Sequence, residues 1–149
     1  ISKICEKKMN ILHSKIYGQE KNETPLLVFH GLFGMLDNWG SFGKEFGELF
    51  PTHLIDLRNH GKSFHSDEFN YEIMVEDVKA YIDFHQLQHV TLLGHSMGGK
   101  IAMLFATIYP EYVEKLIIAD IGPKYYAPHH QTILEGLNAI DFANKELHG

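Results

Sequence analysis

Apolar residues follow two different spacings along this chain, and the two spacings alternate. Short, continuous apolar runs are typical of strands that are buried on both faces of a parallel sheet. These runs predict strands at residues 11–17, 26–29, 53–56, 89–93 and 113–119. Between them, apolar residues recur three or four positions apart, which predicts amphipathic helices. The three helical stripes consist of Trp39, Phe42, Phe46, Leu49 and Phe50, then Met74, Val78, Tyr81 and Ile82, then Ile101, Leu104, Phe105 and Ile108.

Strands that alternate with helices of this length need crossover connections, which are right-handed almost without exception. The order therefore predicts an α/β fold with a mostly parallel sheet and helices on both of its faces. In such sheets the functional groups gather at the carboxyl ends of the strands. The residues that directly follow each predicted strand are therefore the first candidates for chemistry.

Composition narrows the classes of function. The chain has 149 residues, of which 44% are hydrophobic, so we expect one domain or part of one. The formal net charge of −6 disfavours nucleic-acid binding, because no excess of basic residues is available to neutralise phosphates. No apolar run approaches the ~20 residues of a membrane-spanning helix, and no signal sequence is recognisable. We therefore predict a cytoplasmic protein that does not bind membranes.

Cysteine and histidine usage argues against metal chemistry. Cys5 is the single cysteine, which excludes an internal disulfide and fits a reducing compartment. Eleven histidines are present, but they do not show the spacing of a metal-ligand motif. We predict no metal and no cofactor.

The strongest chemical signal is the segment Gly94-His95-Ser96-Met97-Gly98-Gly99, which matches G-x-S-x-G between a predicted strand and a predicted helix. In such a turn the serine is held in a strained backbone conformation with its hydroxyl exposed. The helix N-terminus favours negative charge on a nearby oxygen, so the N–H of Met97 is a candidate oxyanion donor. The segment predicts Ser96 as a nucleophile. The alternative is a glycine-rich turn in which Ser96 only caps the helix.

A second loop reaches the same edge of the predicted sheet. The segment His30-Gly31-Leu32-Phe33-Gly34 follows a buried strand and must turn sharply, which its glycines allow. We predict that the backbone N–H of Leu32 is the second oxyanion donor. The side chain of His30 is expected to bond nearby backbone and to hold the loop. Taken alone, the segment could also be a plain glycine turn.

A polar loop, residues 56–63, follows the next predicted strand. Arg58 is expected to pair with Asp56 or to shape the rim of the pocket, and His60 is a tempting general base. In this architecture, however, the catalytic triad follows the chain order serine, acid, histidine. Arg58 and His60 are therefore interpreted as structural, and the same order excludes the histidines at positions 30, 65 and 95 as the base.

Asp120 ends the last predicted strand, one strand beyond the nucleophile. A carboxylate at this place could orient a histidine and stabilise its imidazolium form during proton transfer. The alternative role is to cap the turn that follows, as aspartate often does.

Together these segments resemble the α/β-hydrolase superfamily, and within it the small bacterial esterases of the YbfF type and their mitochondrial relatives. The resemblance runs from Met9 nearly to the end of the chain, and it rests on the segments 30–34, 36–38, 56–61, 70–71, 94–100 and 120–123. It implies a serine esterase that hydrolyses short-chain acyl esters or thioesters through an acyl-enzyme, with Ser96 as the nucleophile and Asp120 as the acid. The residues expected to contribute to substrate binding are His30, Phe33 and His95.

In that family the chain continues through a helical cap, the last strands of the core and the catalytic histidine. We therefore interpret the sequence as the N-terminal part of an esterase, with the C-terminal part of the fold and most of the cap missing. Residues 1–8 are expected to be a leader or read-through without function, 9–124 the core, and 125–149 the start of the cap. His129, His130 and His148 follow Asp120 but lie in or before the cap segment, so they are not expected to act as the base. The chain alone is expected to be inactive and poorly soluble.

Two further interpretations stay open. One is a related lyase or C–C hydrolase of the kind used in menaquinone synthesis, which carries a similar loop and nucleophile turn. The other is a non-catalytic hydrolase fold that binds a small ligand. The sequence does not specify the acyl-chain length, the leaving group or the oligomeric state.

Overall fold

The computed structural model describes residues 9–122. They form a five-stranded sheet in the order β1-β3-β2-β4-β5, in which β1 is antiparallel to β3 and the other neighbours are parallel. The strands are β1 (Ser14–Tyr17), β2 (Leu26–Phe29), β3 (Thr52–Ile55), β4 (Val90–His95) and β5 (Val113–Ala119). The helices are α1 (Gly40–Gly47), α2 (Tyr71–Phe84) and α3 (Met97–Ile108), with 3-10 turns at Leu36–Trp39 and Pro110–Tyr112. The predictions for residues 1–8 and 125–149 lie outside the described residues.

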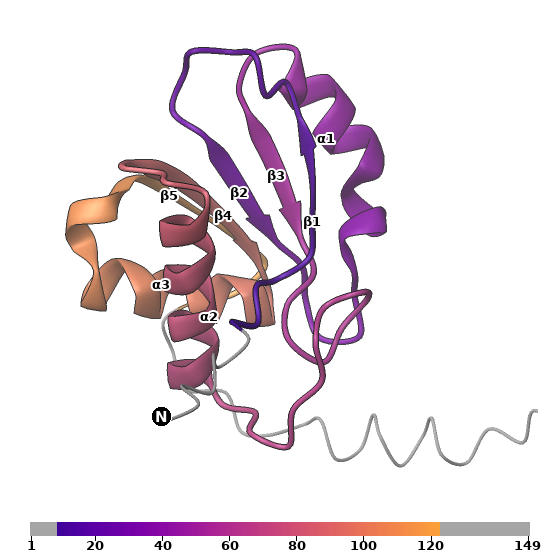
Figure 1. Ribbon diagram of the computed structural model, residues 1–149, viewed down its shortest axis with the longest axis vertical. Coiled ribbons are helices and arrows are strands. Elements are labelled where there is room, and N and C mark those ends of the chain that lie inside the picture. The colour runs from indigo at the N-terminus through magenta and orange to yellow at the C-terminus, as the bar shows by residue number, and fades with distance from the viewer. Residues whose placement is uncertain (1–8, 123–149) are drawn as a thin grey trace, which may run out of the picture.

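Helices lie on both faces of the sheet (Figure 1). α1 packs on one face, against β1 and β3, and α2 and α3 cover the other face. Successive residues of β2 therefore enter two different cores, with Leu27 and Phe29 on the side of α2 and α3, and Leu26 and Val28 on the side of α1. All four are buried, as expected for a strand that is covered on both faces. The predicted α/β fold with a mostly parallel sheet is confirmed.

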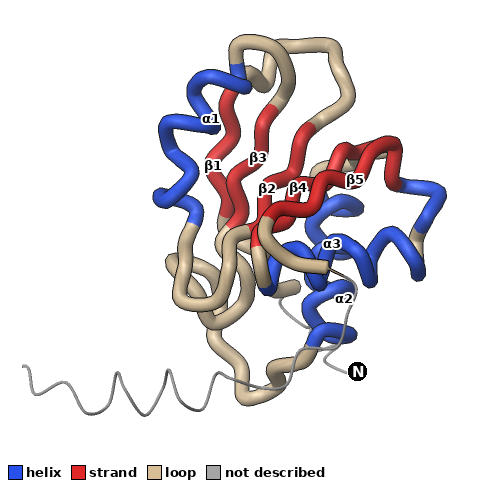
Figure 2. The backbone as a smooth tube through the Cα atoms, turned by 180° about the vertical axis from the view of Figure 1, so that it is seen from behind, coloured by secondary structure: helices blue, strands red, loops and turns tan. Residues whose placement is uncertain are grey.

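β2 and β4 are neighbours at the centre of the sheet (Figure 2), and their register pairs Phe29 with Gly94. Because the two strands are parallel, the segments that follow them leave the sheet side by side at its carboxyl edge. β5 is the last strand in the described sheet, and its Leu116 and Ile117 are 40% and 46% exposed. The two loops that the sequence singles out therefore meet at the middle of the sheet.

The first helix is shorter than its apolar stripe predicts. α1 ends at Gly47, so Leu49 and Phe50 lie in the turn that follows it. Pro51 disfavours helical backbone at Phe50, the residue before it, so the helix cannot continue to the end of the stripe. Gly47 also lies directly on Tyr17, since an added Cβ would sit 2.5 Å from the Cβ of Tyr17. The stripe therefore marks the helix together with its exit turn.

The other stripes agree better with the structure. The four stripe residues of α2 are all buried. In α3, Ile101 and Phe105 are fully buried and Leu104 is partly buried, but Ile108 in the last turn is 45% exposed. β1 begins at Ser14, three residues after the predicted start. Over residues 9–122, we find no helix with the length and apolar character needed to span a bilayer.

Candidate active site

Ser96 stands alone between a strand and a helix. It follows β4 directly and precedes the first residue of α3, and its backbone has φ 52° and ψ −116°. A non-glycine residue rarely adopts a positive φ, and the strain costs roughly 1–3 kcal/mol. Backbone strain of this kind is the mark of the strand-to-helix turn that exposes a nucleophile. The turn conformation expected from the sequence is therefore present at Ser96.

Glycines let the backbone pass closely around this turn. A Cβ on Gly94 would lie 2.3 Å from the carbonyl oxygen of Gly98. A Cβ on Gly98 would in turn lie 2.5 Å from the carbonyl oxygen of Phe29, at the end of β2. Neither contact can be relieved by a side-chain rotation, because the obstructing atoms are backbone. The start of α3 is thus seated directly against the end of β2.

The loop after β2 reaches the same point. A Cβ on Gly31 would lie 3.3 Å from the Cβ of Ser96, so the loop passes close to the candidate nucleophile. The N–H of Gly34 donates to the carbonyl of Gly31 at 2.9 Å, which closes a turn with Leu32 and Phe33 at its corners. Phe33 has φ 62°, again in the left-handed region. Such a turn is sharp enough to bring backbone N–H groups to the edge of the sheet.

The carbonyl of Gly31 also accepts a hydrogen bond from Nδ1 of His30 at 2.7 Å. This carbonyl and the N–H of Leu32 belong to one trans peptide plane and point in opposite directions. Holding the carbonyl therefore fixes the direction of the Leu32 N–H. Among the hydrogen bonds of residues 9–122, none uses the N–H of Leu32 or that of Met97. The two predicted oxyanion donors are thus free of partners in the described structure.

His30 lies beneath the loop and is 1% exposed. Its Nε2 accepts the N–H of Leu57 at 3.0 Å, so the ring is neutral and carries its proton on Nδ1. Burial lowers the pKa of His30, because the charged form would lose its hydration. Both ring nitrogens are bound to backbone, which agrees with the expectation that His30 holds the loop. Its contribution to substrate binding stays a prediction.

Asp120 follows β5 and lies next to His95. Oδ2 of Asp120 is 3.8 Å from Nε2 of His95, and the Asp120 side chain is 89% exposed. Asp120 also has a positive φ of 57°. The ring of His95 faces Trp39 edge-on at 6.3 Å between centroids, and its Nδ1 approaches Gly31. The candidate acid and the substrate-binding candidate His95 are therefore brought together beside Ser96, and the exposed Phe33 lies in the neighbouring loop.

In the polar loop after β3, the ion-pair partner of Arg58 differs from the predicted one. Arg58 does not pair with Asp56, because the carboxylate of Asp56 accepts two backbone N–H groups, from Leu36 at 2.8 Å and from Lys62 at 2.9 Å. Arg58 instead binds both carboxylate oxygens of Asp77 in α2, at 2.6 and 2.8 Å. The structural interpretation of Arg58 agrees with this geometry, but the expected pairing with Asp56 is wrong.

Two hollows border the site, and the sequence indicated neither. One, of about 180 Å³, is lined by Leu32, Phe69, Asn70, Tyr71, Met74 and Met97. The other, of about 380 Å³, is lined by His30, Gly31, Leu32, Gly34, Asn38, Trp39 and His95. Residues 70–71 lie in a segment that carries the family resemblance, but no binding role was predicted for them. Leu32, from the loop after β2, lines both hollows.

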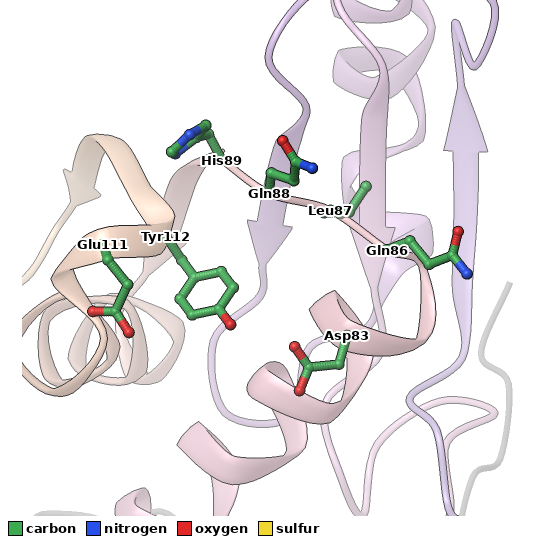
Figure 3. Close-up of a pocket in the computed structure, with 7 residues that line it drawn as sticks. All are labelled: Asp83, Gln86, Leu87, Gln88, His89, Glu111 and Tyr112. Carbon is green, nitrogen blue, oxygen red and sulfur yellow. The ribbon is translucent and has the colours of Figure 1, made fainter.

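A third hollow, of about 480 Å³, lies away from this site (Figure 3). Its lining residues Gln88 and His89 precede β4, and Glu111 and Tyr112 precede β5. It is therefore at the amino ends of the strands, opposite to Ser96. Within the described part of the chain, no group of three or more His, Cys, Asp or Glu side chains could hold a metal ion.

Comparison with known proteins assigns the chain to a family. The model of the alpha/beta hydrolase fold matches residues 24–140, and the chain belongs to this family. Esterase YbfF of Escherichia coli (strain K12) is 34% identical over 134 residues, which are 89% of this chain and 52% of that protein. A solved structure titled "Marine microorganism esterase" has a TM-score of 0.82 at 42% identity and covers 89% of this chain and 52% of that one. The predicted resemblance to YbfF-type esterases is confirmed.

A relative from Haemophilus influenzae with an esterase/lipase name is 49% identical over 125 residues, which are 83% of this chain and 44% of that protein. The chain thus spans about half the length of the curated relatives that it matches. The family model's match, residues 24–140, contains all the candidate residues described above, namely those of segments 30–34 and 94–99 and Asp120.

Proposed function

We propose that the protein is a serine esterase that hydrolyses short-chain acyl esters or thioesters through an acyl-enzyme intermediate. The observation that carries this proposal is the backbone of Ser96, which has a positive φ at the N-terminus of α3, beside two N–H groups that lack partners among the described residues. A serine that only capped the helix would use its side chain to accept a hydrogen bond from the first turn, and Ser96 makes no such bond.

The proposed chemistry starts at the hydroxyl of Ser96. A histidine outside the described residues, oriented by Asp120, accepts the proton while Oγ attacks the acyl carbonyl. The carbonyl oxygen becomes an oxyanion, which the N–H groups of Leu32 and Met97 and the N-terminus of α3 stabilise. The alcohol or thiol leaves with the proton from the histidinium. Water then hydrolyses the acyl-enzyme by the same steps.

The hollow of about 180 Å³ supports a small acyl group as the substrate. Leu32 and Met97 supply both the two proposed oxyanion donors and part of the lining of this hollow. A carbonyl oxygen held by these donors therefore places the acyl chain at the mouth of the hollow. Most of the other lining is apolar, from Phe69, Tyr71 and Met74, and favours a hydrocarbon chain over a polar group.

The test is covalent labelling of the complete protein with a fluorophosphonate probe, which reacts with activated serines. We expect labelling of the wild type, loss of labelling in Ser96→Ala, and full labelling in Ser41→Ala, which removes an exposed serine of α1. Hydrolysis of acetyl and butyryl thioesters should follow the same pattern. A complete protein that does not label would favour the non-catalytic binding fold, and labelling without ester hydrolysis would favour the lyase or C–C hydrolase.

A further inference from the structure

The loop at residues 30–34, which carries the proposed oxyanion donor Leu32, and the loop after β3 are joined by two hydrogen bonds to histidines. His30, in the first loop, accepts the N–H of Leu57 from the second loop at 3.0 Å through Nε2. His60, in the second loop, accepts the N–H of Phe33 from the first loop at 3.2 Å through Nε2. The two rings lie 4.9 Å apart between centroids. Each histidine therefore holds the backbone of the loop to which it does not belong.

Both rings carry their proton on the same nitrogen. Nδ1 of His60 lies 2.8 Å from the carbonyl of Arg58, and Nδ1 of His30 lies 2.7 Å from the carbonyl of Gly31. A carbonyl oxygen can only accept, so Nδ1 is the donor in each ring and Nε2 keeps its lone pair. In this tautomer each imidazole has both nitrogens satisfied. The two hydrogen bonds are possible because both partners at Nε2 are backbone N–H groups.

The N–H that His60 holds belongs to a strained residue. Phe33 has φ 62°, which an aromatic residue seldom adopts, and the residue is 55% exposed. Packing of the ring therefore contributes little to keeping this conformation. The hydrogen bonds that keep it are the one within the turn, from Gly34 to Gly31, and the one from Phe33 to His60.

Leu32 stands between two fixed peptide planes. The plane before it contains the carbonyl of Gly31, which His30 holds, and the plane after it contains the N–H of Phe33, which His60 holds. If the second plane is released, the peptide between Leu32 and Phe33 can rotate and Phe33 can leave the left-handed region. The ψ angle of Leu32 and the φ angle of Phe33 then change together, and the hold of His30 on the carbonyl of Gly31 is the one side-chain anchor among the described residues that remains on the turn carrying the N–H of Leu32.

We propose that His60 is a positioning residue of the oxyanion hole, which acts through the N–H of Phe33 to hold the turn that presents the N–H of Leu32. The role rests on the proposed function, because an oxyanion hole matters only if Ser96 attacks a carbonyl. His60 does not transfer a proton in this role. It keeps the N–H of Leu32 in place before the substrate binds. A donor that is already in position stabilises the oxyanion without the cost of reorganisation during the reaction.

Two variants of similar size separate the two hydrogen bonds of His60. His60→Gln places an amide oxygen near the position of Nε2 and can still accept from Phe33. His60→Asn places its amide near the position of Nδ1, so it can still donate to the carbonyl of Arg58 but is too short to reach Phe33. Both variants are neutral and polar. A difference between them therefore reports on the contact with Phe33 and not on the loss of an imidazole.

The first measurement is NMR of the full chain, because the backbone carbon shifts of Phe33 report its φ. We expect these shifts to stay in place in His60→Gln and to leave the left-handed range in His60→Asn. The second measurement is the rate of fluorophosphonate labelling of the complete protein. Removal of an oxyanion donor costs about 100-fold to 1,000-fold in rate, and displacement of one should cost about tenfold or more in His60→Asn. His60→Gln should stay within about threefold of the wild type.

Equal shifts and equal labelling rates in the two variants would overturn the proposal. So would displaced Phe33 shifts in His60→Asn with an unchanged labelling rate, since the turn would then have no bearing on catalysis. If the wild-type protein does not label, the proposed function fails and the role of His60 in catalysis fails with it. The NMR shifts would still decide whether His60 holds the turn.

Discussion

The guanidinium of Arg58 donates from Nε and Nη2 to the two carboxylate oxygens of Asp77, at 2.6 and 2.8 Å. The two side chains are 6% and 11% exposed, and Nη1 of Arg58 also binds the carbonyl of Glu68. The pair thus ties the loop after β3 to α2. Removing one partner leaves the other charge buried without compensation, so we expect Asp77→Ala to lower the free energy of unfolding by about 3 kcal/mol. Urea denaturation measures this change.

The exposed pair of Lys79 and Asp83 is the matched control for that experiment. Its contact is equally short, at 2.6 Å, but Asp83 is 53% exposed. Exposed pairs of this kind contribute about 0.5 kcal/mol or less, so Asp83→Ala should change the unfolding midpoint very little. Equal losses in the two variants would mean that burial does not set the strength of the Arg58–Asp77 pair.

Gly98 permits the close contact between the start of α3 and the end of β2. A Cβ at this position would lie 2.5 Å from the carbonyl of Phe29 and 2.7 Å from that of His30. Gly98→Ala must therefore push α3 away from β2, and we expect it to lower the free energy of unfolding by about 2 kcal/mol or more. Labelling of Ser96 should fall in the same variant. Both effects are measured on one protein preparation, by denaturation and by probe reaction.

Gly40→Ala serves as the comparison, because an added Cβ there has no atom within 4 Å. Gly40 begins α1 with helical dihedral angles, so alanine should raise stability by roughly 0.5–1 kcal/mol. If Gly98→Ala also proved neutral or stabilising, the close seating of α3 on β2 would be disproved.

His53 makes the fold sensitive to acid. It is 4% exposed in β3, and burial, followed by repulsion from His85, lowers the pKa of His53 from 6.5 to about 4. The unfolded chain binds this proton more readily than the folded chain does between these values, so stability is complete above pH 6.5 and falls as the pH is lowered toward 4. The loss from this group is on the order of 3 kcal/mol. Urea midpoints measured from pH 7.5 to 4 should show it.

His53→Asn removes the titration and keeps a donor near the position of Nδ1, which lies 2.6 Å from the hydroxyl of Tyr81. Its stability should therefore fall less steeply between pH 6.5 and 4 than that of the wild type. Some slope should remain, because burial also lowers the pKa of His30 and of His85. The exposed His65 is the control, and His65→Asn should follow the wild-type curve. A His53→Asn curve parallel to that of the wild type would contradict the assignment.

Tyr71 sets the size of the proposed acyl site. It lines the hollow of about 180 Å³ and is 39% exposed, so it can be shortened with little loss of core packing. Each methylene that gains burial is worth about 0.8 kcal/mol, or roughly fourfold in kcat/KM. Tyr71→Ala should therefore raise the ratio of hexanoyl to acetyl ester turnover several-fold in the complete protein. Glu72→Ala, at the exposed neighbouring position, should leave the ratio unchanged, and an unchanged ratio in both variants would place the acyl chain elsewhere.

The spacing of apolar residues and the glycine motif predicted the helices, strands and turns well, because each of these depends mainly on the residues within it. The apolar run that predicted β5 matches Val113–Ala119, and the turn at Ser96 has the strained backbone that its glycines indicated. The helix before Pro51 was predicted too long, because the apolar spacing continues to Phe50 whereas the helix ends at Gly47, which packs directly on Tyr17.

The contacts between loops could not be predicted in this way. Arg58 finds Asp77 in a helix that the chain reaches later, and His60 finds the N–H of Phe33 from an earlier loop. Which loops cross at the edge of a sheet depends on the order of its strands. That order places β3 on one side of β2 and β4 on the other. The spacing of apolar residues does not indicate this strand order.

The pairing of Phe29 with Gly94 across β2 and β4 would link the proposed catalysis to the folding pathway. The two proposed oxyanion donors follow these strands and are far apart in the chain, so neither local motif can assemble the site by itself. Long-range parallel pairing is among the slower events in folding. During refolding, the reactivity of Ser96 should therefore return only when the central strands have found their register, after the helices have formed. The recovery of Ser96 labelling during refolding should therefore report the last stage of sheet assembly.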